Sequence, residues 1–184
     1  MQLILASNSP RRKELLQKSG VDFNIVVSGF EETAFSSDPI ETAISFAFGK
    51  AQSVYNALSD MQDIVVLGAD TVVYHNGKIL GKPNSENQAI KMLKSLSGKT
   101  HSVITGYALV SKDKTVKGFV QSKVKFAQLT DETINSYIAS GLYKGKAGSY
   151  GIQDGYNLVE NYIGSYNNIV GLPTEEIIKE LEQF

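Results

Sequence analysis

The clearest strand signal in this chain is Ile64-Val65-Val66-Leu67, which runs directly into Gly68-Ala69-Asp70-Thr71. A continuous apolar run of this length is typical of a strand that is covered on both faces of a sheet. Similar short runs alternate with helical patterns along the chain, beginning at residues 3–6. This alternation predicts an α/β fold.

Helix-start signals place helices between these runs. Asp38-Pro39-Ile40-Glu41 combines an N-cap residue, a first-turn proline and a capping-box acid, which predicts a helix to about Leu58. Ser9-Pro10 begins an earlier helix in the same way. Further helices are predicted to begin at Ser85, Thr130 and Pro173. Strands are predicted at residues 3–6, 23–27, 64–67, 101–110 and 116–127, with a hairpin turn at Asn76-Gly77.

The composition is that of an ordinary globular protein, and 184 residues are enough to bury a core as one domain, residues 1–184. A charged fraction of 20% and a net charge of -1 exclude a strongly basic binder of duplex nucleic acid. Cysteine is absent, which excludes disulfides and thiolate metal sites. The first apolar run is too short for a signal peptide, and no segment is long enough to span a bilayer. We therefore expect a cytoplasmic protein with neither a membrane nor a stable nucleic-acid partner.

An anion-binding segment follows the first predicted strand, Ser7-Asn8-Ser9-Pro10-Arg11-Arg12. It combines hydroxyl groups, the free amides of a helix N-terminus and two guanidinium groups. Such amides and the helix dipole attract phosphate, and arginine binds phosphate oxygens through paired hydrogen bonds. The alternative is that Ser9 only caps the helix and that both arginines are solvated.

Asp70 follows the apolar run where open α/β sheets bind their ligands, beyond the carboxyl ends of strands. A buried acid there needs a partner. Its open roles are a metal ligand, a base that activates water, and a hydrogen-bonded structural aspartate. Lys50, Lys82 and Glu31-Glu32 are weak signals individually, because most charged side chains are simply solvated.

The loop Lys146-Ala147-Gly148-Ser149-Tyr150-Gly151-Ile152-Gln153 is a candidate for nucleobase recognition. Its glycines permit close approach of the backbone to a ligand, and Gln153 offers both a donor and an acceptor. A merely flexible loop is the alternative. His75 and His101 have no metal-ligand spacing and are interpreted as structural.

Six blocks of the sequence together resemble the Maf family. They occur in the family's order and extend from near the first residue to near the last, so chance agreement is a poor explanation. The blocks are Ser7-Asn8-Ser9-Pro10-Arg11-Arg12, Gly68-Ala69-Asp70-Thr71, Gly81-Lys82-Pro83, Ser97-Gly98-Lys99-Thr100-His101, Lys146-Ala147-Gly148-Ser149-Tyr150-Gly151-Ile152-Gln153 and Val170-Gly171-Leu172-Pro173.

The resemblance implies an elongated α/β fold with two lobes about a cleft, similar to the inosine triphosphate pyrophosphatases, and usually a homodimer. It also implies hydrolysis of nucleoside triphosphates between the α and β phosphates with a divalent metal, Mg²⁺ or Mn²⁺. Family members are linked to nucleotide housecleaning and, in some cases, to septum formation. Asp70 matches the family's essential acid, generally assigned as the base, and with Glu32 it would hold the metal. Residues that match the phosphate site are Ser7, Arg12, Lys50 and Lys82.

The resemblance implies a substrate class as well. Arg11, Thr71 and Gln153 match the branch that acts on dTTP and UTP, whereas the 7-methyl-GTP branch has a tryptophan, a glutamine and a glutamate there. A neutral amide can pair with the edge of uracil or thymine, while a glutamate would favour guanine. Two positions depart from the family pattern. Asp154 stands where glycine is usual, and Gly49 stands where a charged residue is usual.

Two other functions are open from the sequence. One is a nucleotide-binding or nucleic-acid-binding regulator of cell division with vestigial hydrolysis, which would not need the acid. The other is the same reaction on purine nucleotides, either 7-methyl-GTP or inosine triphosphate. The set of Arg11, Thr71 and Gln153 disfavours this second alternative.

Overall fold

The computed structural model describes residues 1–33, 36–58 and 61–184. Its strands are β1 (Gln2–Leu5), β2 (Phe23–Ile25), β3 (Ile64–His75), β4 (Lys78–Leu80), β5 (Thr100–Val110), β6 (Thr115–Phe126) and β7 (Val159–Ile163). Its helices are α1 (Pro10–Lys18), α2 (Pro39–Ala57), α3 (Glu86–Leu96), α4 (Asp131–Ala139), α5 (Tyr166–Val170), α6 (Thr174–Leu181) and the 3-10 turn η1 (Ala147–Ser149).

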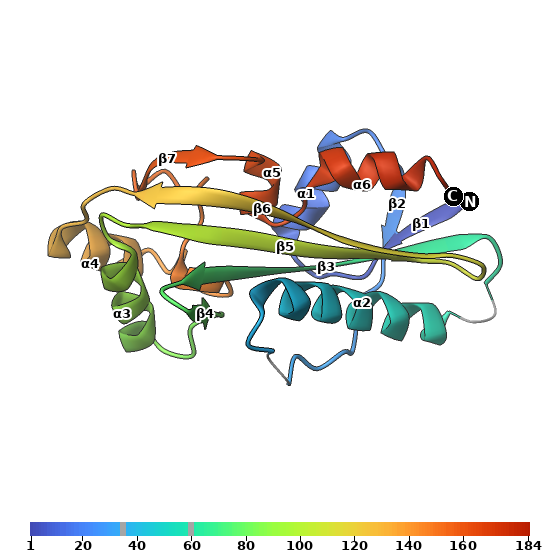
Figure 1. Cartoon of the computed structure of the whole chain (residues 1–184), viewed down its shortest axis with the longest axis horizontal. Helices are drawn as coiled ribbons and strands as arrows, with labels where there is room; N and C mark the ends of the chain where they lie inside the picture. The colour runs from blue at the N-terminus through green and yellow to red at the C-terminus, as the bar shows by residue number, and fades with distance from the viewer. Residues whose placement is uncertain (34–35, 59–60) are drawn as a thin grey trace.

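The strands of the described residues form one mixed sheet in the order β2-β1-β3-β5-β6-β7, with β4 paired to β3. β1 is parallel to both β2 and β3, whereas the pairs β3–β4, β3–β5, β5–β6 and β6–β7 are antiparallel. The strands β3, β5 and β6 run along most of the long axis of the molecule (Figure 1). The predicted elongated mixed α/β sheet is therefore confirmed.

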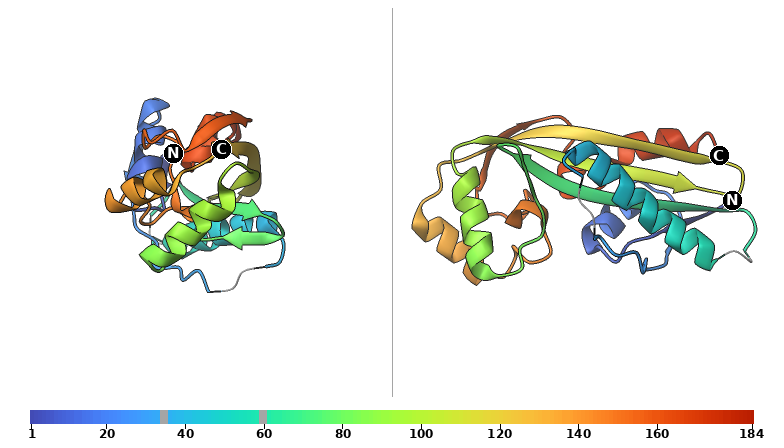
Figure 2. Two further views of the ribbon diagram at one scale, coloured as in Figure 1. Left: turned by 90° about the vertical axis from the view of Figure 1, so that its left-hand side faces the viewer. Right: turned by 60° about the horizontal axis from the view of Figure 1, so that its bottom comes forward.

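Two groups of helices surround the two ends of this sheet, as the views in Figure 2 also show. At the end that holds both termini, α2 covers one face of the sheet, and α1 and α6 cover the other (Figure 1). Ala47 packs on Val66 from the α2 side, while Leu16 and Ile177 pack with Leu67 on the opposite side. This arrangement confirms the first of the two predicted lobes.

The second lobe has a core of its own at the far end of the strands. Leu93 of α3, Phe126 of β6 and Tyr137 of α4 are fully buried there. Val73 of β3 joins the same cluster, so one continuous strand contributes to the cores of both lobes. None of the described helices is long and apolar enough to cross a membrane.

Four of the five predicted helix starts are confirmed by their caps, and the fifth, at Pro173, is confirmed by α6, which follows it without a side-chain cap. The side chains of Ser9, Asp38, Ser85 and Thr130 each accept a hydrogen bond from a backbone amide in the first turn of the following helix. These caps satisfy amides that the helix itself leaves unpaired. Because the interaction is local, sequence alone was sufficient to place them.

The strand prediction at residues 64–67 was too short, and Asp70 does not end a strand. β3 continues to His75, so Asp70 lies in its middle. Gly68 and Asp70 weaken a strand signal locally, but continuous pairing with β5 from Val66 to Tyr74 overrides it. The predicted hairpin turn at Asn76-Gly77 is confirmed by the pairing of β3 with β4.

Candidate active site

The candidate site is a cavity of about 460 Å³ along one edge of β3. On this edge β1 pairs with β3 as far as Leu67, and β4 pairs with it from Val73 onward. Within the described ranges, no strand pairs with the edge between these two points. The lining includes every predicted site residue, namely Ser7, Arg11, Arg12, Glu32, Lys50, Asp70, Thr71, Lys82 and Gln153.

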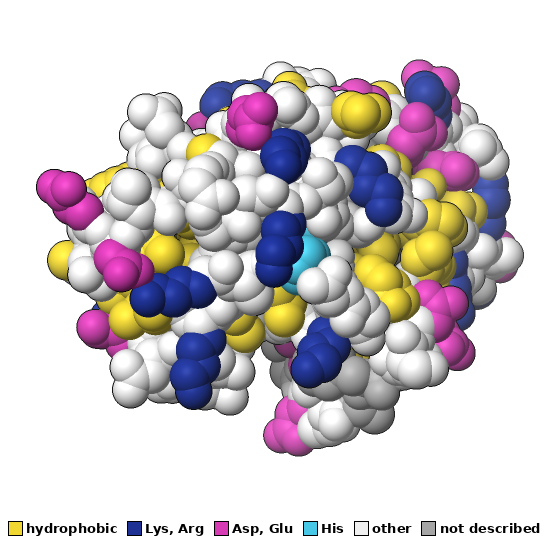
Figure 3. All heavy atoms as spheres, turned by 60° about the vertical axis from the view of Figure 1, so that its left-hand side comes forward, with side chains coloured by type: hydrophobic (Ala, Val, Ile, Leu, Met, Phe, Trp, Pro, Cys, Tyr) yellow, Lys and Arg dark blue, Asp and Glu magenta, His cyan; other side chains and the backbone are white. Residues whose placement is uncertain are grey.

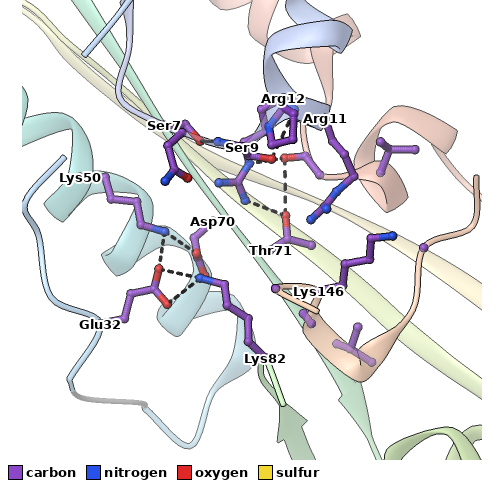
Figure 4. Close-up of a pocket in the computed structure, with 18 of the residues that line it drawn as sticks. Ser7, Ser9, Arg11, Arg12, Glu32, Lys50, Asp70, Thr71, Lys82 and Lys146 are labelled. Atoms are coloured by element: carbon purple, nitrogen blue, oxygen red, sulfur yellow. Dashed lines mark hydrogen bonds and ion pairs between the residues drawn. The ribbon is translucent and has the colours of Figure 1, made fainter. Parts of the chain in front are cut away.

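Four charged side chains meet within the cavity (Figure 4). The Nζ atom of Lys50 lies 2.6 Å from Oδ1 of Asp70 and 2.7 Å from Oε1 of Glu32. The Nζ atom of Lys82 lies 3.3 Å from both carboxylate oxygens of Glu32. Asp70 and Lys50 are buried, while Lys82 is exposed. Two carboxylates therefore converge on one buried ammonium group.

The electrostatic environment keeps Glu32 ionised. Burial alone would raise the pKa of Glu32. Hydrogen bonds and charge from Lys50, with a smaller contribution from Lys82, outweigh burial and hold the pKa of Glu32 below its ordinary value. At neutral pH the cluster thus offers negatively charged oxygen atoms to a cation.

Lys50 reaches Asp70 because α2 lies unusually close to the sheet. A Cβ atom at Gly68 would clash with the backbone carbonyl of Ala47, and one at Gly106 would clash with that of Ala43. Glycine at these two strand positions lets the helix backbone approach β3 and β5. The close packing of α2 on the sheet thereby brings Lys50 within reach of Asp70.

Asp70 and Thr71 point to opposite faces of the sheet, since they are consecutive residues of one strand. Asp70 meets Lys50 on the α2 side. Thr71 lies on the α1 side, where its Oγ1 accepts a hydrogen bond of 3.2 Å from Arg12. The Nε atom of Arg12 also donates to the carbonyl oxygen of Gly171 at 2.8 Å. The acid and the arginine are therefore fixed by adjacent positions of β3.

The segment before α1 brings further polar groups to the cavity. Ser7 is buried, and its Oγ accepts a hydrogen bond from the amide of Ser9 at 3.1 Å. Burial lowers the pKa of Arg12, an effect that the charge of Asp70 opposes. Burial also lowers the pKa of Arg11, which the charge of Asp154 opposes. The two guanidinium groups thus lie in surroundings where an anionic ligand would be a favourable partner.

Sequence reasoning missed α5 and its fully buried Asn168. The Oδ1 atom of Asn168 accepts from the amide of Thr105, and its Nδ2 donates to the carbonyl of Val103 and to Ser122. These bonds attach α5 to β5 and β6, and Gly171 follows directly after this helix. The local signals are Ser165, which caps α5 at Asn168, and Gly171 after it, and they enclose a helix of just five residues.

Comparison with known proteins identifies the family of this chain. The profile of the family described as "Maf-like protein" matches residues 2–184. This chain belongs to the Maf family. A dTTP/UTP pyrophosphatase of Bacillus thuringiensis subsp. konkukian (strain 97-27) is 49% identical over 186 residues, which cover 100% of this chain and 95% of that protein. A dTTP/UTP pyrophosphatase of Bacillus cereus (strain ATCC 10987 / NRS 248) is 50% identical, with coverage of 100% and 90%.

A solved structure, that of the Staphylococcus aureus Ham1 protein, is similar to this Maf chain at a TM-score of 0.48. The sequence identity is 14%, and the similarity covers 70% of this chain and 73% of that one.

Asp154, the first departure from the usual Maf pattern, is not a free surface charge. Its side chain is only 6% exposed and forms an ion pair with Lys146, which is itself buried. The hydroxyl group of Tyr137 donates a hydrogen bond of 2.6 Å to Oδ2 of Asp154. Gln153 next to it is exposed and lines the cavity. Asp154 thus belongs to the framework of the loop rather than to its surface.

Gly49, the second departure from the Maf pattern, faces an aromatic ring. A Cβ atom at this position would clash with the ring of Phe30. Phe30 also packs on Phe46 of α2, with 6.1 Å between ring centroids. Because Gly49 has no side chain, the ring of Phe30 can pack against α2 at this point. Phe30 lies two residues before Glu32, so this contact also holds the segment that carries Glu32.

His75 and His101 do not line the cavity in the described part of this Maf chain. Both are buried, and His101 Nε2 lies 2.7 Å from the hydroxyl of Tyr150. Burial, and secondarily the neighbouring His75, lowers the pKa of His101 to about 3. His101 is therefore a neutral imidazole at physiological pH.

Proposed function

We propose that this Maf protein hydrolyses dTTP, UTP and related or modified pyrimidine nucleoside triphosphates to the monophosphate and pyrophosphate. The observation that carries the proposal is the pair of carboxylates, Asp70 and Glu32, in one cavity with several cations. Full-length relatives about half identical in sequence carry the name dTTP/UTP pyrophosphatase, which supports this substrate class.

Local positive charge would bind the triphosphate, because the chain as a whole carries a net charge of only -1. Cationic residues of the cavity lining include Arg11, Arg12, Lys50, Lys82 and Lys146. Preorganised cations stabilise the charge that develops on phosphate oxygens in the transition state. On the face drawn in Figure 3, Lys and Arg side chains are scattered among acidic and uncharged ones, which favours a small anion over nucleic acid.

Asp70 is proposed as the general base. It would take a proton from a water molecule while the water oxygen forms a bond to the α-phosphorus. The bond between the α-phosphorus and the oxygen that bridges to the β-phosphorus then breaks, and pyrophosphate leaves. Lys50 orients the carboxylate through its 2.6 Å contact with Oδ1.

The same acids fit a divalent metal, Mg²⁺ or Mn²⁺. Both carboxylates already converge on a cation, the Nζ of Lys50, and oxygen ligands suit these metals. Among the described residues, no group of three or more His, Asp or Glu side chains is arranged to hold a metal ion by itself. Phosphate oxygens and water would therefore supply the remaining ligands, as is usual for Mg²⁺. A bound metal would offset phosphate charge and polarise the reacting group.

Base selection is assigned to Gln153, together with Arg11 and Thr71, which line the same cavity. The amide of Gln153 can donate to and accept from the edge of uracil or thymine. Thr71 contacts Arg12, Thr105 and Gly171, so its contribution would be made largely through Arg12.

Further proposals follow from membership of the Maf family. We infer a cytoplasmic homodimer in which residues 1–184 act as a single nucleotide-pyrophosphatase domain, which serves nucleotide housecleaning and is linked to septum formation. The sheet that contributes to both lobes supports the single domain. Light scattering tests the dimer, and a single unfolding transition tests the domain.

The decisive measurement is pyrophosphate release from UTP, dTTP, 7-methyl-GTP and inosine triphosphate, with Mg²⁺, with Mn²⁺ and with chelator. Native protein should release pyrophosphate from UTP and dTTP only when metal is present. The Asp70→Asn variant should remain folded and should lose at least about 100-fold in rate. Asp113→Asn, an exposed acid in the turn between β5 and β6, is the matched control. Unchanged activity of Asp70→Asn, or no pyrophosphate release by native protein from any of the four nucleotides, would reject the proposal.

A further inference from the structure

The turn that carries Gln153 is hydrogen-bonded to the second lobe through Tyr137, and Ile152 of the same turn packs against the core of that lobe. The amide of Gly151 donates to the hydroxyl of Tyr137 at 3.2 Å, and this hydroxyl donates to Oδ2 of Asp154 at 2.6 Å. Residues 151 and 154, which flank Gln153 on either side, are therefore bonded to the same hydroxyl group. The amide of Asp154 also donates to the carbonyl of Gly151 at 3.2 Å, which closes the turn.

The partners of this hydroxyl are built into the protein interior. Tyr137 of α4 is fully buried in the core of the second lobe. The side chains of Asp154 and Lys146 are only 6% and 9% exposed. Burial, together with the hydrogen bond and the charge of Asp154, raises the pKa of Tyr137, so the hydroxyl keeps its proton and donates it. Buried polar groups in such a fully satisfied network hold a defined geometry.

Asp154 also requires the glycine opposite it. A Cβ atom at Gly151 would lie 2.7 Å from a carboxylate oxygen of Asp154. The carboxylate thus fills the space that a larger residue at position 151 would occupy. Its charge pairs with Lys146 and acts on Arg11, two cations of the cavity lining.

We propose that Tyr137 and Asp154 are positioning residues that hold the 151–154 turn in the conformation with which Gln153 recognises the nucleobase. This inference rests on the proposed function, because it assigns Gln153 to the base. Neither Tyr137 nor Asp154 is among the described residues that line the cavity. Fixing the turn before binding removes the ordering cost that a flexible recognition loop would incur. Loss of the network should therefore weaken base discrimination more than it slows the chemical step.

The test uses Tyr137→Phe, Asp154→Ala and the conservative Asp154→Asn in the full chain. Tyr156→Phe is the control, since Tyr156 packs edge-on against Tyr137 with 5.2 Å between centroids. For Tyr137→Phe and Asp154→Ala, we expect KM for UTP to rise about tenfold with kcat little changed. The ratio of kcat/KM for UTP to that for GTP should fall about tenfold. Asp154→Asn, which keeps an acceptor for Tyr137, should lie between these variants and the control.

Amide hydrogen exchange provides a readout that does not depend on turnover. The 151–154 amides should exchange at least about tenfold faster in Tyr137→Phe and Asp154→Ala than in native protein or Tyr156→Phe. Circular dichroism identifies any variant that does not fold. If Asp154→Ala does not fold, Tyr137→Phe and Asp154→Asn test the inference. Unchanged exchange, or a UTP to GTP ratio within about twofold of native, would overturn the inference. If native protein releases no pyrophosphate, the proposed function fails, while exchange and equilibrium binding of UTP and GTP still test the turn.

Discussion

Lys50 reaches Asp70 across the packed interface of α2 and β3, with 2.6 Å between Nζ and Oδ1. Both side chains are buried, so neither charge can be fully solvated when its partner is removed. The same ammonium group serves Glu32, which makes Lys50 the common partner of both acids.

Replacing Lys50 with methionine should therefore destabilise the protein and abolish pyrophosphate release. Leaving the buried carboxylate of Asp70 without its cation should lower the free energy of unfolding by about 3 kcal/mol at neutral pH. Urea unfolding measures this change. Lys18→Met, which breaks the exposed pair with Glu14, should have no measurable effect. Equal stability of the two variants would contradict the account.

The close approach of α2 predicts an effect of one added methyl group. Gly68→Ala would place Cβ against the backbone of Ala47, so the helix must shift. We expect a loss of about 2 kcal/mol in stability and a fall in kcat, because the shift separates Lys50 from Asp70. Gly29→Ala, where a Cβ meets no atom within 4 Å among the described residues, is the matched control. Native kcat in Gly68→Ala would show that this contact does not position the lysine.

A second glycine tests how Glu32 is held. Gly49→Ala should displace the ring of Phe30 and with it the segment that carries Glu32, so activity should fall about tenfold. The double variant Gly49→Ala with Phe30→Leu replaces the obstructing ring by a smaller side chain and should recover part of the activity. Steady-state kinetics of the single and double variants measure the coupling between the two positions. Additive losses would argue against steric contact as the cause.

The buried imidazole of His101 predicts a pH dependence of stability. Its pKa of about 3 lies below the ordinary value of 6.5, so the unfolded chain binds a proton between these values that the folded protein does not. Stability should therefore fall as pH decreases below about 6.5, with His101 contributing a loss of about 2 kcal/mol between about pH 7.5 and about pH 5.

Unfolding of two variants at both pH values isolates this contribution. His101→Gln removes the titrating group and should flatten the dependence. Tyr150→Phe removes the same 2.7 Å hydrogen bond but keeps the imidazole, so it should retain the native slope. A native slope in His101→Gln would assign the effect to other groups.

Much of the architecture could be predicted because its signals are local. Caps such as Ser9 and Asp38 specify where helices begin, whatever packs on them. The extent of β3 was different, because its middle is held by pairing with β5 rather than by its own apolar residues. α5 was missed for the same reason, since Asn168 finds its partners on distant strands.

In the candidate site, too, some residues could be predicted from the sequence and others could not. Each predicted residue reaches the cavity, because resemblance to a family identifies positions without needing distances. The residues that hold them could not be found in this way. Nothing near Asp154 in the sequence indicates that Tyr137 and Lys146 would surround its carboxylate. Such partners are set by tertiary packing, which brings α4 against the loop.

The antiparallel ladder between β3 and β5 fixes more than the shape of the sheet. Asp70 is opposite Gly106 and Thr71 is opposite Thr105, and sliding one strand by a single residue would exchange the faces that the two side chains reach. Because the surrounding pairs exclude such a slip, the position of Asp70, the proposed general base, is fixed by the pairing of β3 with β5. A substitution in the 151–154 turn should therefore leave the position of Asp70 in the sheet unchanged.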